Sequence, residues 1–391
     1  MTEFAARIDA VTPAELRAVG SRKWTVPADG EIGAFIAEMD FGVAQPVQDA
    51  VRGLLDSGNT GYVPVWMDAE FSGACAEFQQ AQFGWHVDPA NVHSVSDVLK
   101  VMEIALDYFT RPGGAVILPT PAYMPFFEVA PAHGRRIIEV PCHNDNGYFT
   151  LDLDGIDAAF EAGGEMLVLC NPHNPVGRVL SRTELEAVCA IVAKHGGGVF
   201  ADEIHAPITY ADSPPHIPYA SINEVAASHT LTGTSASKAF NLPGLKCAAA
   251  IVSNDRDARI WRTLPDVVTH SAATIGVAAN IAAYREGGPW FAEVLEYLSG
   301  NRAAFAEQVS SKLPGVTVRP PDGSYLSWLD FRGYGLNEQA AAWVHREAGV
   351  MLNEGSTFGA PGVGFARLNM ATPRPILTEI IDRIATALAR R

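Results

Sequence analysis

Short apolar runs alternate with helix-like segments through the middle of this chain, and this alternation constrains the fold more than any other feature of the sequence. Six runs have the length and composition of buried strands: Ala115–Leu118, Arg136–Val140, Met166–Cys170, Val199–Ala201, Thr230–Thr232 and Ala248–Val252. The segments between them, such as Val98–Phe109 and Arg182–Lys194, carry apolar residues at helical spacing. Because strands that alternate with helices form mostly parallel sheets, the sequence predicts a large α/β domain.

The last third of the chain has a different pattern and predicts a smaller α+β domain. Three segments resemble strands and two resemble helices: Val316–Val318, Leu326–Phe331 and Phe365–Met370, then Glu338–Glu347 and Ile376–Leu388. Residues Tyr284–Ser311 predict a long helical connector that is interrupted at Gly287-Gly288-Pro289. We therefore expect a large domain over 49–284, a small domain over 285–391, and an N-terminal segment, 1–48, that joins the small domain.

Charge and composition argue against several classes of partner. The net charge of −16 disfavours nucleic acid and anionic membranes, because both reward clustered Lys and Arg. Residues 1–16 lack the apolar core of a signal peptide, and the small-residue stretch Ser271–Ala283 is too short and too polar to span a bilayer. The five cysteines are widely spaced, so neither a disulfide framework nor a zinc site is expected. We expect a cytoplasmic protein without a metal.

Polar side chains follow three of the predicted strands. NPHNPVGR (171–178) follows the third run, DEIH (202–205) follows the fourth, and GTSASKAFN (233–241) follows the fifth. In open α/β sheets, ligands bind beyond the carboxyl ends of the strands. The amide of Asn174, the carboxylate of Asp202 and the amine of Lys238 are therefore expected at one edge of the sheet.

These three groups suit pyridoxal 5′-phosphate (PLP). A buried carboxylate favours a proton on the pyridine nitrogen, an amide can hydrogen-bond the phenolate oxygen, and an amine can form a Schiff base and later act as a base at the substrate Cα. Taken singly the signals are weak, since Asn-Pro repeats are common turn signals and Asp-Glu after a strand is a common helix cap. Their combination, with no GxGxxG after a strand, Walker A, HExxH or GxSxG sequence, predicts a PLP site.

The same motifs resemble a known family. NPHNPVGR, DEIH and TSASKAFNLPGLK (234–246) are similar to fold-type I PLP enzymes of the aminotransferase class I/II superfamily, over essentially the whole chain. The chain is most similar to the bacterial cystathionine β-lyase (cysteine-S-conjugate β-lyase) branch of MalY/PatB type. That similarity rests on Lys23-Trp24, AEMDF (37–41), Gly61-Tyr62, the His residues of NPHNP and DEIH, and GFARLNMATPR (364–374). The resemblance implies a mostly parallel seven-stranded sheet and a homodimer.

The resemblance assigns a role to each residue that matches the family motifs. It gives Lys238 the Schiff base, Asp202 the pyridine nitrogen and Asn174 the phenolate oxygen. His205 stands where many aminotransferases have a Tyr that touches the same oxygen. Tyr123, in TPAYMPF, matches the aromatic residue that stacks on the cofactor ring, although the pattern alone fits an ordinary core aromatic equally well.

The phosphate is expected at the start of a helix, where free N–H groups and the helix dipole favour an anion. The residues expected there are Ser96, Asp97, Val98, Ser235, Ser237, Lys246 and, from the neighbouring subunit, Tyr62. Two of them depart from the family pattern. Lys246 replaces an Arg of many class I enzymes and loses its bidentate geometry. The helix start at Ser96-Asp97 lacks the Gly usual in this loop, and Asp97 adds a negative charge, so its side chain is expected to point away from the phosphate.

The substrate is expected to be an amino acid. Arg367 matches the arginine that pairs with the substrate carboxylate, and Asn174, Tyr123 and Asp40 are the other residues expected to contact the substrate. The branch favours C–S β-elimination of L-cystathionine or a related cysteine S-conjugate to a thiol, pyruvate and ammonia. Because transamination uses the same residues, an aminotransferase stays open, as does a specialised pathway enzyme that acts on a cysteine conjugate. The intact Lys238 argues against a regulator that senses a ligand without turnover.

Overall fold

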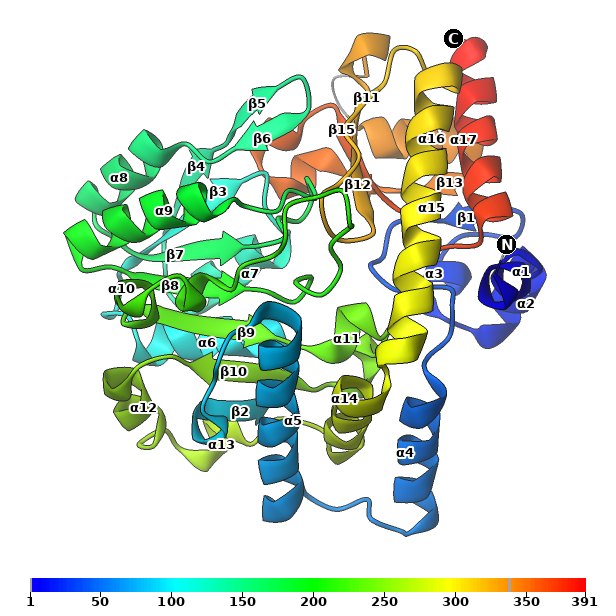
Figure 1. Cartoon of the computed structure of the whole chain (residues 1–391). Helices are drawn as coiled ribbons and strands as arrows, with labels where there is room; N and C mark the ends of the chain where they lie inside the picture. Colours follow the sequence, from blue (N-terminus) through cyan, green and yellow to red (C-terminus); the bar gives the residue numbers. More distant parts are fainter. Residues whose placement is uncertain (1, 337–338) are drawn as a thin grey trace.

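A seven-stranded sheet forms the centre of the computed structural model, which describes residues 2–336 and 339–391 (Figure 1). The strand order is β2-β10-β9-β8-β7-β3-β4. The strands are β2 Val92–Val95, β3 Ala115–Thr120, β4 Ile137–Pro141, β7 Gly164–Cys170, β8 Gly198–Asp202, β9 Thr230–Thr234 and β10 Ala248–Val252. Strand β10 runs antiparallel to both of its neighbours, and the other neighbouring pairs are parallel. The predicted mostly parallel sheet is confirmed.

Both faces of this sheet are buried, because alternate side chains of each strand enter different cores. In β3, Val116 and Leu118 belong to the core on one face, whereas Ile117 belongs to the core on the other. In β7 the same alternation separates Met166 from Leu167. Strands that are covered on both faces require apolar residues at every position, and this requirement explains the continuous apolar runs in the sequence.

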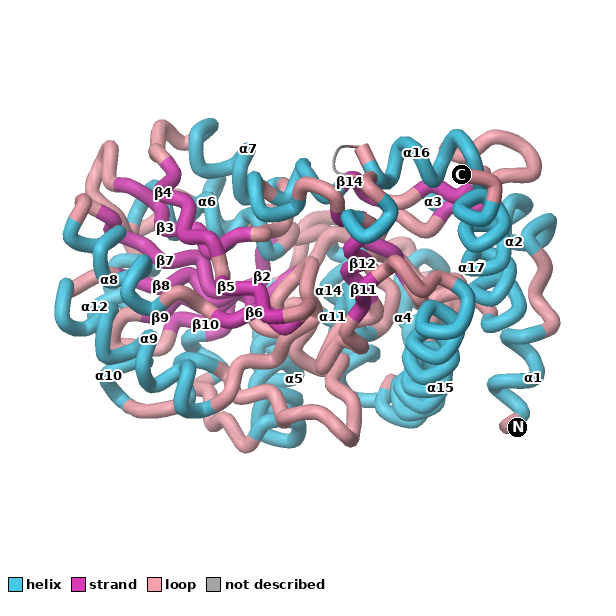
Figure 2. The backbone as a smooth tube through the Cα atoms, turned by 90° about the horizontal axis from the view of Figure 1, so that it is seen from above, coloured by secondary structure: helices cyan, strands magenta, loops and turns pink. Residues whose placement is uncertain are grey.

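Helices cover the two faces of the sheet (Figure 2). Helices α6 (Val98–Tyr108) and α7 (Pro125–Ala132) pack on one face, and α8 (Leu153–Glu161) and α9 (Arg182–His195) pack on the other. Beside β2 and β10, α5 (Val65–Phe83) packs against α14 (Thr274–Glu286), which also contacts α4 (Gln45–Asp56). Shorter elements complete this part: the hairpin β5 His143–Asp145 and β6 Tyr148–Thr150, and helices α10 Glu224–Ala227, α11 Ala236–Ala239, α12 Asp255–Trp261 and α13 Asp266–Thr269.

A second, smaller sheet has the strand order β11-β12-β15-β14. Its strands are β11 Thr317–Val318, β12 Leu326–Asp330, β14 Asn353–Glu354 and β15 Phe365–Asn369, and its helices are α15 Gly288–Lys312, α16 Ala340–Ala348 and α17 Arg374–Ala389. The N-terminal elements are α1 Glu3–Asp9, α2 Pro13–Val19, α3 Arg22–Thr25 and β1 Ile32–Gly33, which pairs in parallel with β13 Val350–Met351. Leu16, Trp24 and Ile32 enter the same core as α16 and α17.

Helix α15 contributes side chains to two cores. Phe291 and Val294, near its start, pack in the core that includes α5 and α14, whereas Phe305 and Val309 pack in the core that includes α16 and α17. The predicted domain boundary at 284/285 therefore lies just before a helix that both parts share. The predicted interruption at Gly287 is also present, because α14 ends at Glu286 and α15 begins at Gly288.

The predicted elements agree with the structure within a few residues at each end. All six predicted strands of the large sheet overlap the observed ones, and β2 is the seventh. The helix predicted from Glu338 begins at Ala340 among the described residues, while Glu338 itself lies outside them.

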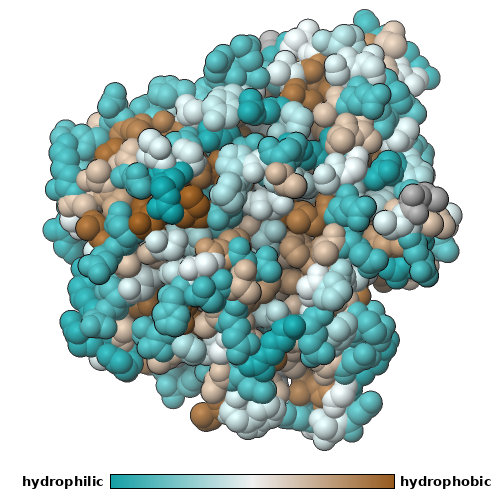
Figure 3. All heavy atoms as spheres, in the orientation of Figure 1, coloured by the Kyte–Doolittle hydropathy of each residue, from teal (hydrophilic) through white to brown (hydrophobic). Residues whose placement is uncertain are grey.

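None of the helices in the described ranges combines the length and apolarity needed to cross a membrane. The face seen in Figure 3 is mostly hydrophilic with scattered apolar patches.

Candidate functional site

A cavity of about 180 Å³ lies at the carboxyl ends of β7, β8 and β9. Ten of the residues predicted from the sequence line it: Ser96, Asp97, Val98, Tyr123, Asn174, Asp202, His205, Ser237, Lys238 and Lys246. The sheet register explains their convergence. Cys170 at the end of β7 pairs with Asp202 at the end of β8, and Asp202 pairs with Gly233 near the end of β9. The polar side chains that follow these strands therefore lie together at the cavity.

Asp202, which is buried, and Lys238, which is partly buried, are two ionisable groups of this cavity with strongly shifted pKa values. Burial raises the pKa of Asp202 to about 7, although the Ile204 N–H donates to its Oδ1 at 3.1 Å and the Lys238 charge acts in the opposite direction. Burial also lowers the pKa of Lys238 to about 8, and Arg367 lowers it further while Asp202 raises it. Desolvation disfavours the charged form of each group, so both titrate near neutral pH.

The Lys238 amine is held by a backbone carbonyl group near the N-terminus, a contact that the sequence did not predict. Its Nζ donates to the carbonyl oxygen of Ala37 at 2.8 Å, and the Tyr325 hydroxyl donates to the same oxygen at 3.1 Å. We call residues 35–39 the N-terminal cover. Other side chains fix its backbone: Arg367 binds Phe35 O, Asn369 binds Ile36 O and Glu38 O, and Asn241 binds Met39 N and O. The motif AEMDF marked this segment, but no pattern indicated that its backbone faces Lys238.

Asn174, His205 and Tyr123 surround the same space. Arg367 Nη1 donates to Asn174 Oδ1 at 3.0 Å, so the amide group of Asn174 is oriented by the arginine. His205 is buried, and burial lowers its pKa well below the usual range, so its ring is neutral. Burial raises the pKa of Tyr123, which keeps its hydroxyl protonated. The cavity therefore offers neutral hydrogen-bonding groups around two titratable ones.

The start of α6 faces one end of the cavity. Within the described residues, the N–H groups of Asp97, Val98 and Leu99 have no acceptor, as is usual in the first turn of a helix. Asp97 Oδ1 accepts from the Lys100 N–H at 2.9 Å and caps the helix, and Asp97 Oδ2 pairs with Lys246 Nζ at 3.0 Å. Unpartnered N–H groups beside a lysine fit a phosphate.

Two residues that were predicted to contact the cofactor or the substrate lie outside the lining of the cavity. The structure places Ser235 outside the cavity lining, where its hydroxyl donates to Cys247 O at 2.7 Å and accepts from the Ser237 N–H at 3.0 Å. Asp40 is buried away from the cavity, where Oδ2 pairs with Lys23 Nζ at 2.7 Å and Oδ1 accepts from Trp24 Nε1 at 2.8 Å. Both oxygens of Asp40 thus bind side chains of the N-terminal elements, and Asp40 does not line the cavity.

Arg367 and Tyr62 also lie outside the lining of the cavity. Arg367 is buried beside it and donates to Asn174, Asn353 and Phe35, and burial lowers its pKa to about 10. Its Nε has no partner within the described part of the chain. The Tyr62 side chain is 100% exposed on the outer surface of this single chain, where it lines a separate hollow of about 980 Å³.

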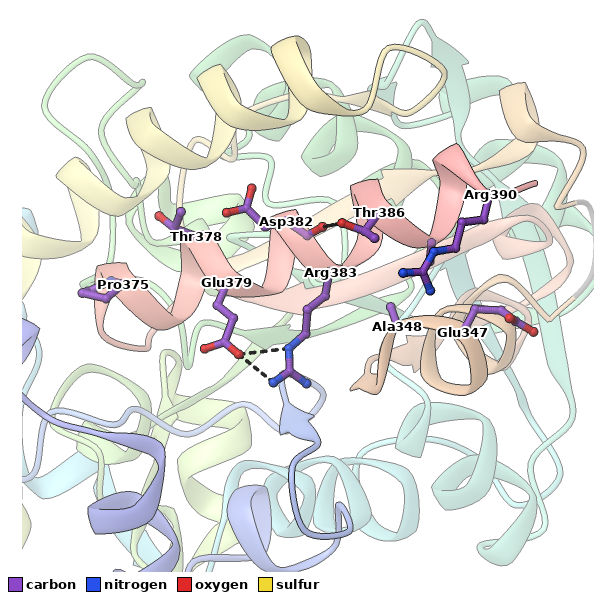
Figure 4. Close-up of a pocket in the computed structure, with 10 residues that line it drawn as sticks. Glu347, Ala348, Pro375, Thr378, Glu379, Asp382, Arg383, Thr386 and Arg390 are labelled. Carbon is purple, nitrogen blue, oxygen red and sulfur yellow. Dashed lines mark hydrogen bonds and ion pairs between the residues drawn. The ribbon is translucent and has the colours of Figure 1, made fainter.

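Another hollow, of about 450 Å³, lies between α16 and α17 (Figure 4). Several of its polar side chains already have partners: Arg383 pairs with Glu379 at 2.6 Å, and the Thr386 hydroxyl donates to the Asp382 carbonyl oxygen at 2.8 Å. These groups do not converge on a common point (Figure 4). We therefore place the candidate active site in the cavity at the strand ends.

Comparisons with known proteins identify the family. Residues 36–384 match the family Aminotransferase class I and II. The chain is 36% identical to the cystathionine beta-lyase of Corynebacterium glutamicum, across 96% of this chain and 98% of that protein. It is 31% identical to cystathionine beta-lyase PatB of Bacillus subtilis, across 91% and 92% of the two chains.

A solved structure agrees with these relatives. The crystal structure from Corynebacterium diphtheriae of a protein named as a PLP-dependent beta-cystathionase has a TM-score of 0.92 and 35% identity, and covers 97% of this chain and 98% of its own. The chain therefore belongs to the aminotransferase class I and II family. Within that family it is similar to proteins named cystathionine beta-lyase. The family and fold predicted from the motifs are confirmed.

The raised pKa of Asp202 predicts that this residue destabilises the cofactor-free protein at neutral pH. The folded protein retains a proton on Asp202 up to about pH 7, whereas the unfolded chain loses it near pH 4, so stability falls as pH rises between these values. Asp202→Asn should therefore raise the free energy of unfolding at pH 7 to 8, by up to about 4 kcal/mol, with little gain at pH 4.

Denaturant unfolding of the cofactor-free protein from pH 4 to pH 8 measures this effect. The matched control is Asp212→Asn, since the Arg302 side chain holds the pKa of Asp212 below its usual range and the change should lower stability as pH rises. An Asp202→Asn protein that is less stable than the wild type at every pH would contradict the desolvation argument.

Proposed function

We propose that this protein is a PLP-dependent carbon-sulfur lyase that cleaves L-cystathionine or a related cysteine S-conjugate to a thiol, pyruvate and ammonia. The observation that carries the proposal is a partly buried amine and a buried carboxyl, Lys238 and Asp202, in one cavity at the strand ends. The names of the relatives support the reaction, because several at 31–36% identity are cystathionine beta-lyases.

The residues of the cavity would hold PLP at four places. Asp202 would bind the pyridine nitrogen, and Asn174 and His205 would bind the phenolate oxygen. Tyr123 would lie against the ring. The N–H groups at the start of α6, with Ser237 and Lys246, would bind the phosphate. PLP, when bound, supplies an electron sink that makes the Cα proton of an amino acid acidic.

Lys238 is suited to move that proton. With a pKa of about 8, a substantial fraction of its amine is neutral at physiological pH and can accept a proton from the substrate Cα. The amine returns the proton to the leaving sulfur or to solvent after the Cβ–S bond breaks. The N-terminal cover would position the Lys238 amine, because Ala37 O accepts from its Nζ and is itself held by the Tyr325 hydroxyl.

Arg367 is proposed to bind the carboxylate of the substrate. It is held beside the cavity by Asn174, Asn353 and the backbone of Phe35, and its Nε is unpartnered among the described residues. A fixed guanidinium with a free N–H fits one carboxylate oxygen. This contact would orient the amino acid so that its Cα faces Lys238.

The protein is proposed to be a cytoplasmic homodimer in which Tyr62 reaches the partner's phosphate site. The exposed apolar side chains of Leu55, Val65 and Val267 line this hollow together with Tyr62, and Trp66, which follows Val65, is also exposed. Apolar surface of this extent is typical of an interface, and Figure 3 shows part of it at the lower end of α4 and α5. The five free cysteines support a reducing compartment.

The reaction is tested by an end-point assay with L-cystathionine and no keto acid. The PLP-loaded protein should release pyruvate and thiol in equal amounts, while Lys238→Ala should release neither. Lys312→Ala, which changes an exposed lysine of α15 that pairs with Asp382, serves as the control and should match the wild type. Release of neither product, with conversion of the amino donor only after a keto acid is added, would instead identify an aminotransferase.

The dimer is tested by mixing two damaged subunits. Co-expression of Lys238→Ala and Tyr62→Ala chains should form heterodimers in which one site combines an intact Lys238 with an intact Tyr62 from the other chain. Activity should then exceed that of either homodimer. If Tyr62 served its own chain, or no site at all, mixing would restore nothing.

A further inference from the structure

Ser324 has an unusual backbone for a residue with a side chain. Its φ is +70°, in the left-handed region that L-residues rarely adopt, and it is buried. Its neighbours fix this conformation. The Ser324 N–H donates to Ile208 O at 2.7 Å, and its carbonyl oxygen accepts from the Tyr210 hydroxyl at 2.8 Å. A strained residue that is held on both sides often serves a function nearby.

The Ser324 hydroxyl lies against the candidate active site. Its Oγ is 3.0 Å from Nδ1 of His205, whose ring lines the cavity. His205 is buried and neutral, so its ring carries a single proton. The position of that proton decides whether the ring shows the cavity a hydrogen-bond donor or an acceptor.

The hydrogen-bond partners of Ser324 indicate which ring nitrogen of His205 carries the proton. Within the described part of the chain, Ser324 Oγ has no hydrogen-bond partner other than His205 Nδ1. If Nδ1 carried the ring proton, the hydroxyl proton of Ser324 would have no acceptor among the described residues, so this contact favours a hydroxyl that donates to an unprotonated Nδ1. The ring proton is left to Nε2, the nitrogen on the opposite side of the ring.

We propose that Ser324 is a positioning residue that holds His205 as its Nε2–H tautomer, so that His205 presents a donor to the cavity. The role toward the cofactor rests on the proposed function: the donor would serve the phenolate oxygen of PLP beside the amide of Asn174. The Nε2–H of His205, held by Ser324, would then take the place of the tyrosine hydroxyl that many aminotransferases have at this position.

The tautomer is tested first in the cofactor-free protein, by ¹⁵N NMR of the histidine rings, with His205→Gln to assign the signals. In the wild type, Nδ1 of His205 should show the downfield shift of an unprotonated nitrogen. In Ser324→Ala and Ser324→Gly that shift should move toward the value of a protonated nitrogen as the second tautomer appears. Gly suits the left-handed backbone, so a change shared by both variants belongs to the hydroxyl and not to backbone strain.

A second readout uses the PLP-loaded protein. A donor to the phenolate oxygen weakens the hold of that oxygen on the proton shared with Lys238, so its loss should raise the pH midpoint of the visible absorption by about one unit in both variants. Ser327→Ala removes a different buried hydroxyl, one without a hydrogen-bond partner among the described residues, and should change neither readout.

The outcomes separate the two claims. An Nδ1–H tautomer in the wild type, or an unchanged tautomer in both Ser324 variants, would overturn the proposal. A shifted tautomer with an unchanged midpoint would overturn the role of His205 toward the cofactor. Failure of the wild type to bind PLP would reject the proposed function, and the tautomer measurement would still decide what Ser324 does.

Discussion

The desolvation of Lys238 and Asp202 is the constraint on which the rest of the site depends. Burying an amine and a carboxyl costs free energy, and their pKa values of about 8 and about 7 express that cost. The apolar strands that end beside them supply the burial, because both faces of the sheet are packed. The same burial leaves each group able to gain or lose a proton near neutral pH. The burial of these two groups thus lowers the free energy of unfolding at the place where the proposed reaction requires a reactive amine.

The two parts of the chain meet at this site through the N-terminal cover. The Ala37 carbonyl oxygen accepts from Lys238, which follows the large sheet, and from Tyr325, which precedes a strand of the small sheet. Directly after the cover, Asp40 is anchored by a fully buried ion pair with Lys23. Removing one partner of such a pair leaves an uncompensated buried charge, so the pair fixes where the cover lies. Asp40, which was predicted to contact the substrate, thus supports the position of the N-terminal cover in this structure.

The sequence predicted the parts of the site that depend on strand order. Asn174, Asp202 and Lys238 each follow a strand, and parallel strands bring their ends together. The residues that were missed depend on distant contacts. Nothing near Ala37 indicates that its carbonyl faces Lys238, and Pro-Asp-Gly-Ser before Tyr325 indicates only a turn. Ser235 was assigned to the phosphate because it lies near Lys238, but its hydroxyl is used to cap α11. Tyr62 stays a prediction, because its proposed contact lies on a second chain.

We propose that Lys238 is the amine that binds the cofactor. The most direct measurement is borohydride reduction of the PLP-loaded protein, followed by digestion and mass spectrometry of the labelled peptide. The chain has six lysines, at positions 23, 100, 194, 238, 246 and 312, so the label can be assigned to one of them. A single phosphopyridoxyl group on Lys238 is expected. A label on Lys246, the other lysine that lines the cavity, or on any lysine outside it, would show that Lys238 is not the amine that binds the cofactor.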